Sequence, residues 1–375
     1  MNSNQKKFGI YVFLSTFSRN LIEVFIPVIL YKFGYTIKEV LLYYLIVNVT
    51  SIILTYPFVY LSKKFNNKIL AIIGIIAFVL VQISLNFLTY SYMYLFIIAV
   101  FYAIYRRGYW ISRRYYNLKI IKNYNISKIY SIISIINQVG VIISAYFGSL
   151  ILDYISLKLL TIFAIVLFIL SIVPLYTLKF EHEKTNVKLE LINNVRKIPK
   201  SNIYLFGSYE LINIVKFLIP LYIFIYVKDK YQVIGIVNLI TNFALITFTY
   251  LYGKKLDNSN NNFLKLAIFL TVLIYILKVN SNGLNLLIIS FIEGIIIKMY
   301  ELSINKEFYT FSKKFEYYNY NLIYELTQNF FRSVVTLLLF VINIDIKFMV
   351  YITLGFVFIG IFLKFQYNKN EIKTL

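Results

Sequence analysis

Two side chains of opposite charge, Arg19 and Glu23, lie four residues apart in the first apolar stretch of the chain. Residues at this spacing share one face of a helix and can form an ion pair, and Pro27 follows on the same face. A charge inside a membrane costs about 2.5–3.5 kcal/mol even on the mildest scale, so charges there usually have a role. The pair either neutralises two buried charges and shapes the fold, or it responds to a bound solute or ion.

Polar side chains also follow one face of several later apolar stretches. The eleventh stretch carries a continuous polar stripe that ends at Arg332, and the seventh places Glu210 and Asn213 on a shared face. We take ten such residues as candidates for binding a solute or an ion: Arg19, Glu23, Asn137, Gln138, Glu210, Asn213, Asn242, Glu293, Gln328 and Arg332. Hydrogen bonding or ion pairing between helices is the alternative role for each of them.

The sequence argues against an enzyme, a metal centre or a bound cofactor. It has no cysteine and a single histidine, His182 in a charged stretch, so thiol chemistry is excluded and a histidine-based metal site is not expected. It also has no glycine-rich phosphate loop and no nucleophile motif, and its carboxylates are not paired as hydrolysis would require. The candidate residues are therefore expected to bind rather than to catalyse.

The composition places most of these residues in a membrane. Hydrophobic residues make up 60% and charged residues 14% of the 375 positions, and the mean hydropathy is +0.73. A soluble protein of this size cannot bury so much apolar surface. Because a span needs about 20 apolar residues, we predict an all-α integral membrane protein with twelve transmembrane helices. The predicted spans are residues 8–31, 39–61, 69–89, 92–112, 129–152, 158–178, 203–227, 233–252, 264–279, 284–305, 321–342 and 347–366.

The net charge of +22 is concentrated in the short segments between these spans. Lysines and arginines accumulate on the side of both termini, so the positive-inside rule predicts cytoplasmic termini in a bacterial plasma membrane. No nucleic-acid partner is expected, because the basic residues do not share a polar surface. We expect Arg113 and Arg114 to lie at the inner surface and contact anionic lipid head groups. Arg106 and Arg107 can snorkel toward that surface, and holding of an anionic substrate is the alternative role of the cluster.

The chain divides into two similar halves. Pro27 and Pro220 stand in matching apolar contexts in the first and seventh spans, and a basic turn follows the next span of each half, at Lys63 and Lys254. Parallel repeats of this kind are typical of one large transporter architecture. We predict an N-terminal six-helix bundle at 1–178, a cytoplasmic linker at 179–202 and a C-terminal six-helix bundle at 203–375. The linker forms either an amphipathic helix on the inner surface or a solvated connection.

These features resemble the major facilitator superfamily over essentially the whole chain. Its members carry a glycine, and an aspartate four positions on, in the inner loop after the second helix of each half. Gly253 and Asp257 match this inner-loop gating motif, whereas Ser62 and Asn66 stand at the corresponding positions of the first half. The fifth span lacks the Gly-Pro pair of the drug/proton antiporters, so no subfamily is assigned. The resemblance implies two six-helix bundles with pseudo-two-fold symmetry and a site between them.

On this basis we expect a secondary active transporter that moves a small organic solute by alternating access. The proton is the expected coupling ion, because carboxyl groups on separate spans can each load and release a proton, whereas sodium needs several oxygen atoms at one point. The expected partners are the solute, the proton and membrane lipids, and the chain is expected to be a monomer. A lipid flippase or scramblase, or a non-transporting membrane protein on the same scaffold, is the alternative.

Overall fold

The computed structural model describes residues 3–121, 126–179, 189, 198–252, 261–314 and 316–373, which form helices and their connections. The first half contains α1 (Ser3–Glu23), α2 (Ile26–Lys32), α3 (Ile37–Lys64), α4 (Asn67–Asn86), α5 (Tyr92–Ile121), α6 (Ile126–Tyr154), α7 (Leu157–Leu170) and α8 (Ile172–Tyr176). The second half contains α10 (Lys200–Tyr222), the π-helical turn η1 (Ile223–Val227), α11 (Tyr231–Tyr252), α12 (Asn261–Lys278), α13 (Gly283–Lys314), α14 (Tyr317–Ile342) and α15 (Ile346–Lys373).

Each predicted span corresponds to one long helix or to two short elements in line. The paired elements are α1 with α2, α7 with α8, and α10 with η1. Ten of the described helical segments are long and apolar enough to cross a membrane, and α5 and α12 complete the twelve. The prediction of an all-helical membrane protein with twelve helices is confirmed.

Proline interrupts the first span of each half. Pro27 stands in the first turn of α2, directly after the break that ends α1 at Glu23. Pro220 lies inside α10, and the π-helical turn η1 follows it. Proline lacks a backbone N–H, so it removes a helical hydrogen bond and favours breaks of this kind. Both spans are therefore interrupted in their predicted outer part, next to their polar residues.

The helix contacts of the two halves correspond one to one. In the first half α1 packs against α6 and α7, α3 against α5, and α4 against α5 and α7. In the second half α10 packs against α14 and α15, α11 against α13, and α12 against α13 and α15. The halves meet where α3 packs on α14 and α6 packs on α11. This correspondence is the predicted pair of six-helix bundles related by pseudo-two-fold symmetry.

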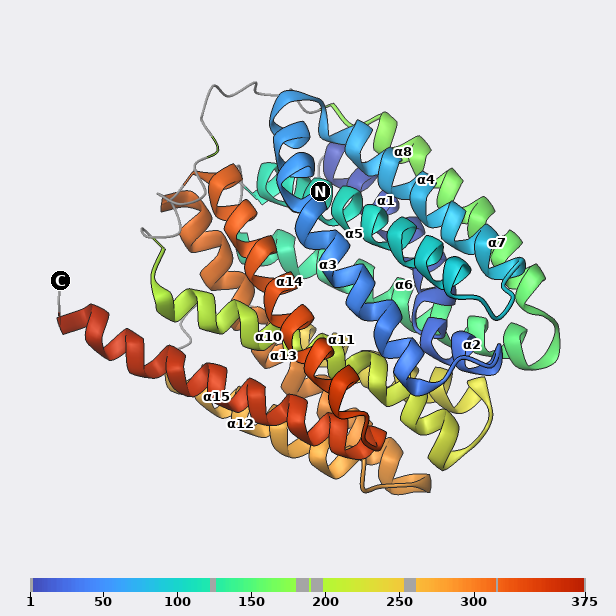
Figure 1. Cartoon of the computed structure of the whole chain (residues 1–375). Coiled ribbons are helices and arrows are strands. Elements are labelled where there is room, and N and C mark those ends of the chain that lie inside the picture. Colours follow the sequence, from blue (N-terminus) through green and yellow to red (C-terminus); the bar gives the residue numbers. More distant parts are fainter. Residues whose placement is uncertain are drawn as a thin grey trace.

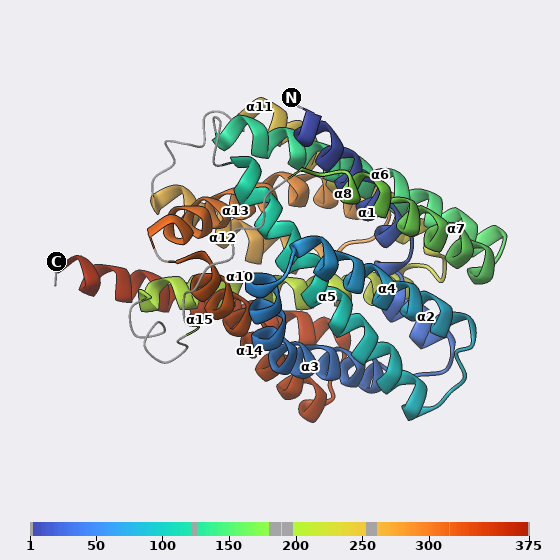
Figure 2. The same ribbon diagram turned by 90° about the horizontal axis from the view of Figure 1, so that it is seen from above.

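The three most apolar spans, formed by α4, by α7 with α8 and by α15, lie at the two edges of the molecule. In Figure 1, α4 and α7 form one edge and α12 and α15 form the opposite edge, and Figure 2 shows the same arrangement from above. These helices expose large apolar side chains such as Phe163, Phe269 and Phe358. Such residues face the apolar part of a membrane at low cost, and the polar spans are left in the centre.

Small residues allow the central helices to approach closely. A Cβ atom added to Gly148 of α6 would lie 2.5 Å from the carbonyl oxygen of Leu21 in α1. A Cβ atom on Gly108 of α5 would lie 2.5 Å from the carbonyl oxygen of Leu70 in α4. Membrane helices pack through such small residues, because apolar side chains gain little by leaving lipid.

The inner-loop motif is described only in the first half. Ser62 donates a hydrogen bond to Asn67 Oδ1 at 2.6 Å, and the Asn66 side chain accepts from the backbone N–H of Lys68 at 3.0 Å, which caps α4. These two residues therefore fix the turn between α3 and α4. Gly253 and Asp257 lie outside the described residues, as does most of the predicted 179–202 linker.

Candidate functional site

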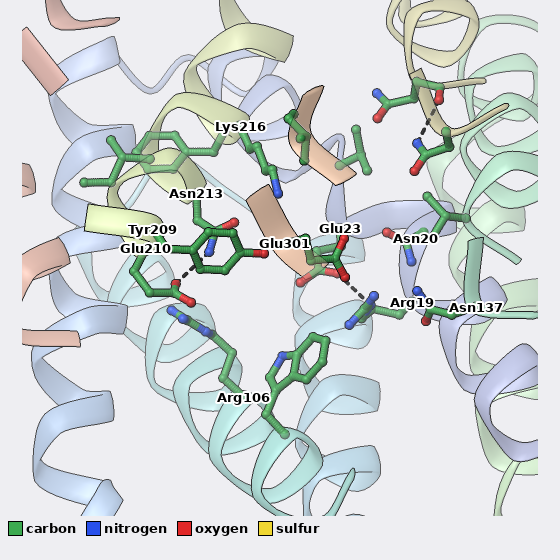
Figure 3. A pocket seen from close by; sticks show the side chains of 18 of the residues that line it. Arg19, Asn20, Glu23, Arg106, Asn137, Tyr209, Glu210, Asn213, Lys216 and Glu301 are labelled. Carbon is green, nitrogen blue, oxygen red and sulfur yellow. Dashed lines mark hydrogen bonds and ion pairs between the residues drawn. The ribbon is translucent and has the colours of Figure 1, made fainter. Parts of the chain in front are cut away.

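A cavity of about 550 Å³ lies between the two bundles. Its walls come from α1, α3, α5 and α6 of the first bundle and from α10, α11, α13 and α14 of the second, and part of it appears in Figure 3. Of the edge helices only α12 reaches it, through Tyr275 and Lys278. The volume falls within the range of roughly 300–1,000 Å³ that is typical of small-molecule sites.

The structure brings all ten candidate residues to this one cavity. They come from six different helices, and each contributes to the wall: Arg19, Glu23, Asn137, Gln138, Glu210, Asn213, Asn242, Glu293, Gln328 and Arg332. The amides Asn48 and Asn238 line it as well. The spacing of polar residues on separate apolar spans therefore identified side chains that line one common cavity.

Arg19 and Glu23 form the expected ion pair on α1. Arg19 Nε lies 2.8 Å from Glu23 Oε2, and the Tyr102 hydroxyl of α5 donates to the other carboxylate oxygen. The Arg19 guanidinium lies 5.6 Å from the ring centre of Tyr109 and 5.1 Å from that of Trp110. Ring faces attract cations at such distances, so the aromatic side chains of α5 help to hold Arg19 in place.

A second ion pair links α10 to α14 within the C-terminal bundle. Arg332 Nη1 lies 3.3 Å from Glu210 Oε2, and Asn213 donates to the same oxygen at 2.6 Å. Asn329 accepts a hydrogen bond from Arg332 at 3.1 Å. The carboxylate and the guanidinium are thus neutralised by each other and oriented by amides, as Figure 3 shows for Glu210 and Asn213.

Glu293 of α13 is paired with a residue that the sequence did not single out. Its carboxylate contacts the ammonium group of Lys278 at the end of α12, and the Thr241 hydroxyl donates to it at 3.4 Å. Lys278 is 3% exposed, and Glu293 is 4% exposed. A lysine at the last position of an apolar span resembles an interfacial residue, so its spacing gave no signal of this contact.

The arginine cluster of α5 corrects a prediction. Arg113 and Arg114 were expected at the inner surface against lipid head groups, and Arg106 and Arg107 were expected to snorkel toward it. All four instead line the cavity. The helix continues to Ile121, beyond the predicted end of the span at residue 112, so the last two arginines are still inside the bundle.

The signal for this placement was present in the sequence. Tyr102, Arg106, Trp110, Arg113 and Asn117 follow one another at helical spacing, and all five line the cavity. This is the same kind of stripe that identified the eleventh span. The aromatic residues between the arginines made the stripe resemble a membrane-interface belt instead.

Charged contacts also join the two bundles. Arg107 and Arg114 of α5 both form ion pairs with Glu325 of α14, and Arg114 Nε donates to Asn321 Oδ1 at 3.1 Å. Glu325 is 1% exposed. These contacts tie α5 to the N-terminal half of α14, which lies at the predicted cytoplasmic end of the helix.

A second polar contact between the bundles involves Lys298 of α13. This fully buried lysine donates to Ser134 Oγ of α6 at 2.8 Å and lies 3.4 Å from Glu301 Oε2. Among the described residues, no group of three or more histidine, cysteine, aspartate or glutamate side chains is placed to hold a metal ion.

Comparisons with known proteins agree with this architecture. The family model of the Major Facilitator Superfamily matches residues 8–303. The solved structure of a mutant of the nucleoside transporter NupG is similar, with a TM-score of 0.72 over 97% of this chain and 100% of that chain, at 12% sequence identity. No curated protein sequence matches the chain. Because the family model covers well over half of the residues, the chain belongs to the Major Facilitator Superfamily, a family of transporters rather than enzymes.

Proposed function

We propose that this protein is a secondary active transporter that moves a small organic solute across the membrane by alternating access, with protons as the coupling ion. The observation that carries the proposal is the cavity of about 550 Å³ between the two bundles, whose walls combine ion pairs and amides from both halves. A site shared by two related bundles can open to either side when the bundles rock about it.

The wall of the cavity favours a solute over a lipid as cargo. Lipid handling needs an apolar groove that opens sideways to the membrane. Charged and amide side chains instead occur on every helix that contributes to the centre, and the apolar side chains of α4, α7 and α15 face away from it. These charged and amide groups can bind a polar solute by replacing its hydration shell.

Glu23 is the proposed proton carrier. It holds Arg19 by an ion pair and accepts from Tyr102, and its side chain is 24% exposed toward the cavity. We expect the proton to bind when Arg19 moves away, because the guanidinium and the proton compete for the same carboxylate. Separation of the pair in one conformation would couple proton binding to the movement of the bundles.

We further propose that both termini are cytoplasmic and that the protein lies in a bacterial plasma membrane, with bundles at 1–178 and 203–375 joined by the segment 179–202. The distribution of loop lysines and arginines supports this orientation. The gating role of Ser62, Asn66, Gly253 and Asp257 is part of the same proposal. In the first half the hydrogen bonds of Ser62 and Asn66 provide a rigid turn without the usual aspartate.

Transport in proteoliposomes tests the function. Vesicles with a pH-sensitive dye inside are given a panel of sugars, nucleosides, amino acids and organic acids under an imposed pH gradient, with fluorescent phospholipid followed in parallel. Nucleosides are included because of the likeness to NupG, which at 12% identity shows the fold alone. We expect proton movement with at least one solute and no lipid movement. Lipid movement without solute flux would favour the lipid alternative.

A further inference from the structure

The cavity between the bundles carries more positive than negative charge. Among the described residues of its wall, eight side chains are cationic and five are carboxylates. Each of these carboxylates already lies within ion-pair distance of a cation, and Glu325 holds two. All five carboxylates therefore already form ion pairs within the protein, and the wall retains an excess of cationic side chains.

Three cations of the wall have no carboxylate partner within the described part of the chain. Arg106 donates to the neutral Asn48 Oδ1 at 3.1 Å. Arg113 donates to neutral groups, among them Asn137 Oδ1 at 2.7 Å and the Tyr109 hydroxyl at 2.8 Å. Lys216 makes neither a hydrogen bond nor an ion pair with the described residues, and its side chain is exposed to the cavity. No carboxylate of the described residues therefore lies within ion-pair distance of any of the three.

The three cations approach the cavity from both bundles. Arg106 and Arg113 lie two helical turns apart on the cavity face of α5, and Lys216 projects from α10. Figure 3 shows Arg106 and Lys216 pointing into the same pocket from opposite sides. A ligand that interacts with all three would thus touch the N-terminal and C-terminal bundles at once.

Uncompensated cations within a membrane protein are costly, and an anion relieves that cost. Guanidinium groups match the geometry of carboxylate and phosphate oxygens, and a lysine adds a point charge. We propose that the cavity binds a small organic anion whose carboxylate or phosphate group is held by Arg106, Arg113 and Lys216. This inference rests on the proposed function of the cavity as the transport site, and it names the class of solute.

Binding to the full-length protein in lipid nanodiscs tests the charge class. Two matched series are compared by thermal shift and calorimetry: glucose, glucosamine, gluconate and glucose 6-phosphate, and benzyl alcohol, benzylamine, benzoate and phenyl phosphate. We expect only anions to bind, and the carboxylate and phosphate arms show which oxyanion is preferred. Equal binding of a neutral or cationic member, or no binding by any anion, would overturn the proposal.

Substitutions test the residues. Arg106→Gln and Lys216→Gln should each weaken anion binding about tenfold or more, the usual effect of losing a charge-assisted hydrogen bond. Lys216→Arg should retain binding, which separates loss of charge from misfolding. Lys230→Gln is the matched control, because Lys230 is exposed in the loop before α11 and lies outside the cavity. Unchanged affinity in both glutamine variants would contradict the assignment.

The nanodisc has no separate compartments, so this experiment is independent of flux. Anion binding without gradient-driven uptake in proteoliposomes would refute the proposed transport function and leave the anion site standing. Uptake of a neutral solute with no anion binding would refute the anion site and leave the proposed transport function standing.

Discussion

At Glu23 one carboxylate meets two donors of different kinds, the guanidinium of Arg19 and the hydroxyl of Tyr102. The first donor carries a charge and the second does not. Movement of Arg19 alone would leave the carboxylate hydrogen-bonded to Tyr102 but without its cation. In the proposed cycle this movement is the step that frees Glu23 for the proton.

Substitution of Glu23 tests this step. Glu23→Gln keeps the size and a hydrogen-bond acceptor but carries no titratable group, so gradient-driven accumulation should fall about tenfold or more while solute exchange continues. Accumulation and exchange are measured in the same proteoliposomes. Asp229→Asn is the control, because this carboxylate is 78% exposed and lies outside the cavity. Full uphill transport by Glu23→Gln would refute the coupling role.

The pair Glu210 and Arg332 tests whether buried charges in the cavity stabilise one another. Removing one partner strands the other, so Glu210→Gln or Arg332→Gln alone should destabilise the protein by about 3–5 kcal/mol. The double variant should be more stable than either single variant, because no isolated charge remains. Thermal unfolding in detergent measures all four proteins of this double-mutant cycle. Strictly additive losses would contradict the coupling.

At the scale of helices, α5 and α14 are joined by ion pairs of Arg107 and Arg114 with one carboxylate, that of Glu325. In Glu325→Gln, Arg107 and Arg114 lose their shared partner and repel each other, so this end of the bundles should separate more often. Cross-linking of Ile111→Cys to Leu322→Cys, which replace residues of one apolar cluster, should then slow several-fold. Glu316→Gln is the control, since Glu316 precedes α14 and pairs with neither arginine. An unchanged rate would exclude this role for Glu325.

The contact between α4 and α5 depends on the absence of a side chain. Gly108→Ala would press a methyl group against the backbone of α4, so we expect a loss of about 1–3 kcal/mol in stability. Gly355→Ala is a matched control in α15, where nothing lies within 4 Å of the added atom. That variant should be neutral or slightly stabilised, because alanine favours helices. Thermal unfolding of both variants measures the difference, and equal stability would contradict the packing.

Helices were predictable from the sequence, and contacts between them were only partly so. Apolar length identified every span, because each must satisfy its backbone within the membrane. Helical spacing placed Glu210 and Arg332 on polar faces but could not pair them, since the two residues are 122 positions apart in the sequence. The place of Lys278 in the cavity wall could not be predicted, because a lysine at the end of a span is typical of the membrane interface. The aromatic neighbours of the α5 arginines likewise favoured an interfacial position for residues that line the cavity. Pairing across the fold depends on packing, which local spacing does not encode.

At the scale of the whole molecule, two bundles with matching contacts surround one cavity, and every candidate residue lies on its wall. Symmetry of this kind allows the wall to face either side of the membrane through the same contacts at opposite ends. The central claim is therefore alternating access, which does not depend on knowing the solute.

Thiol labelling tests that claim most directly, because the natural chain has no cysteine. Asn238→Cys places one thiol on the cavity wall, and Lys6→Cys and Asp229→Cys place one at each predicted surface. An impermeant thiol reagent is applied to intact cells and to inverted vesicles. We predict that Asp229→Cys reacts only in cells, Lys6→Cys only in inverted vesicles, and Asn238→Cys in both. Reaction of Asn238→Cys from one side alone would contradict alternating access.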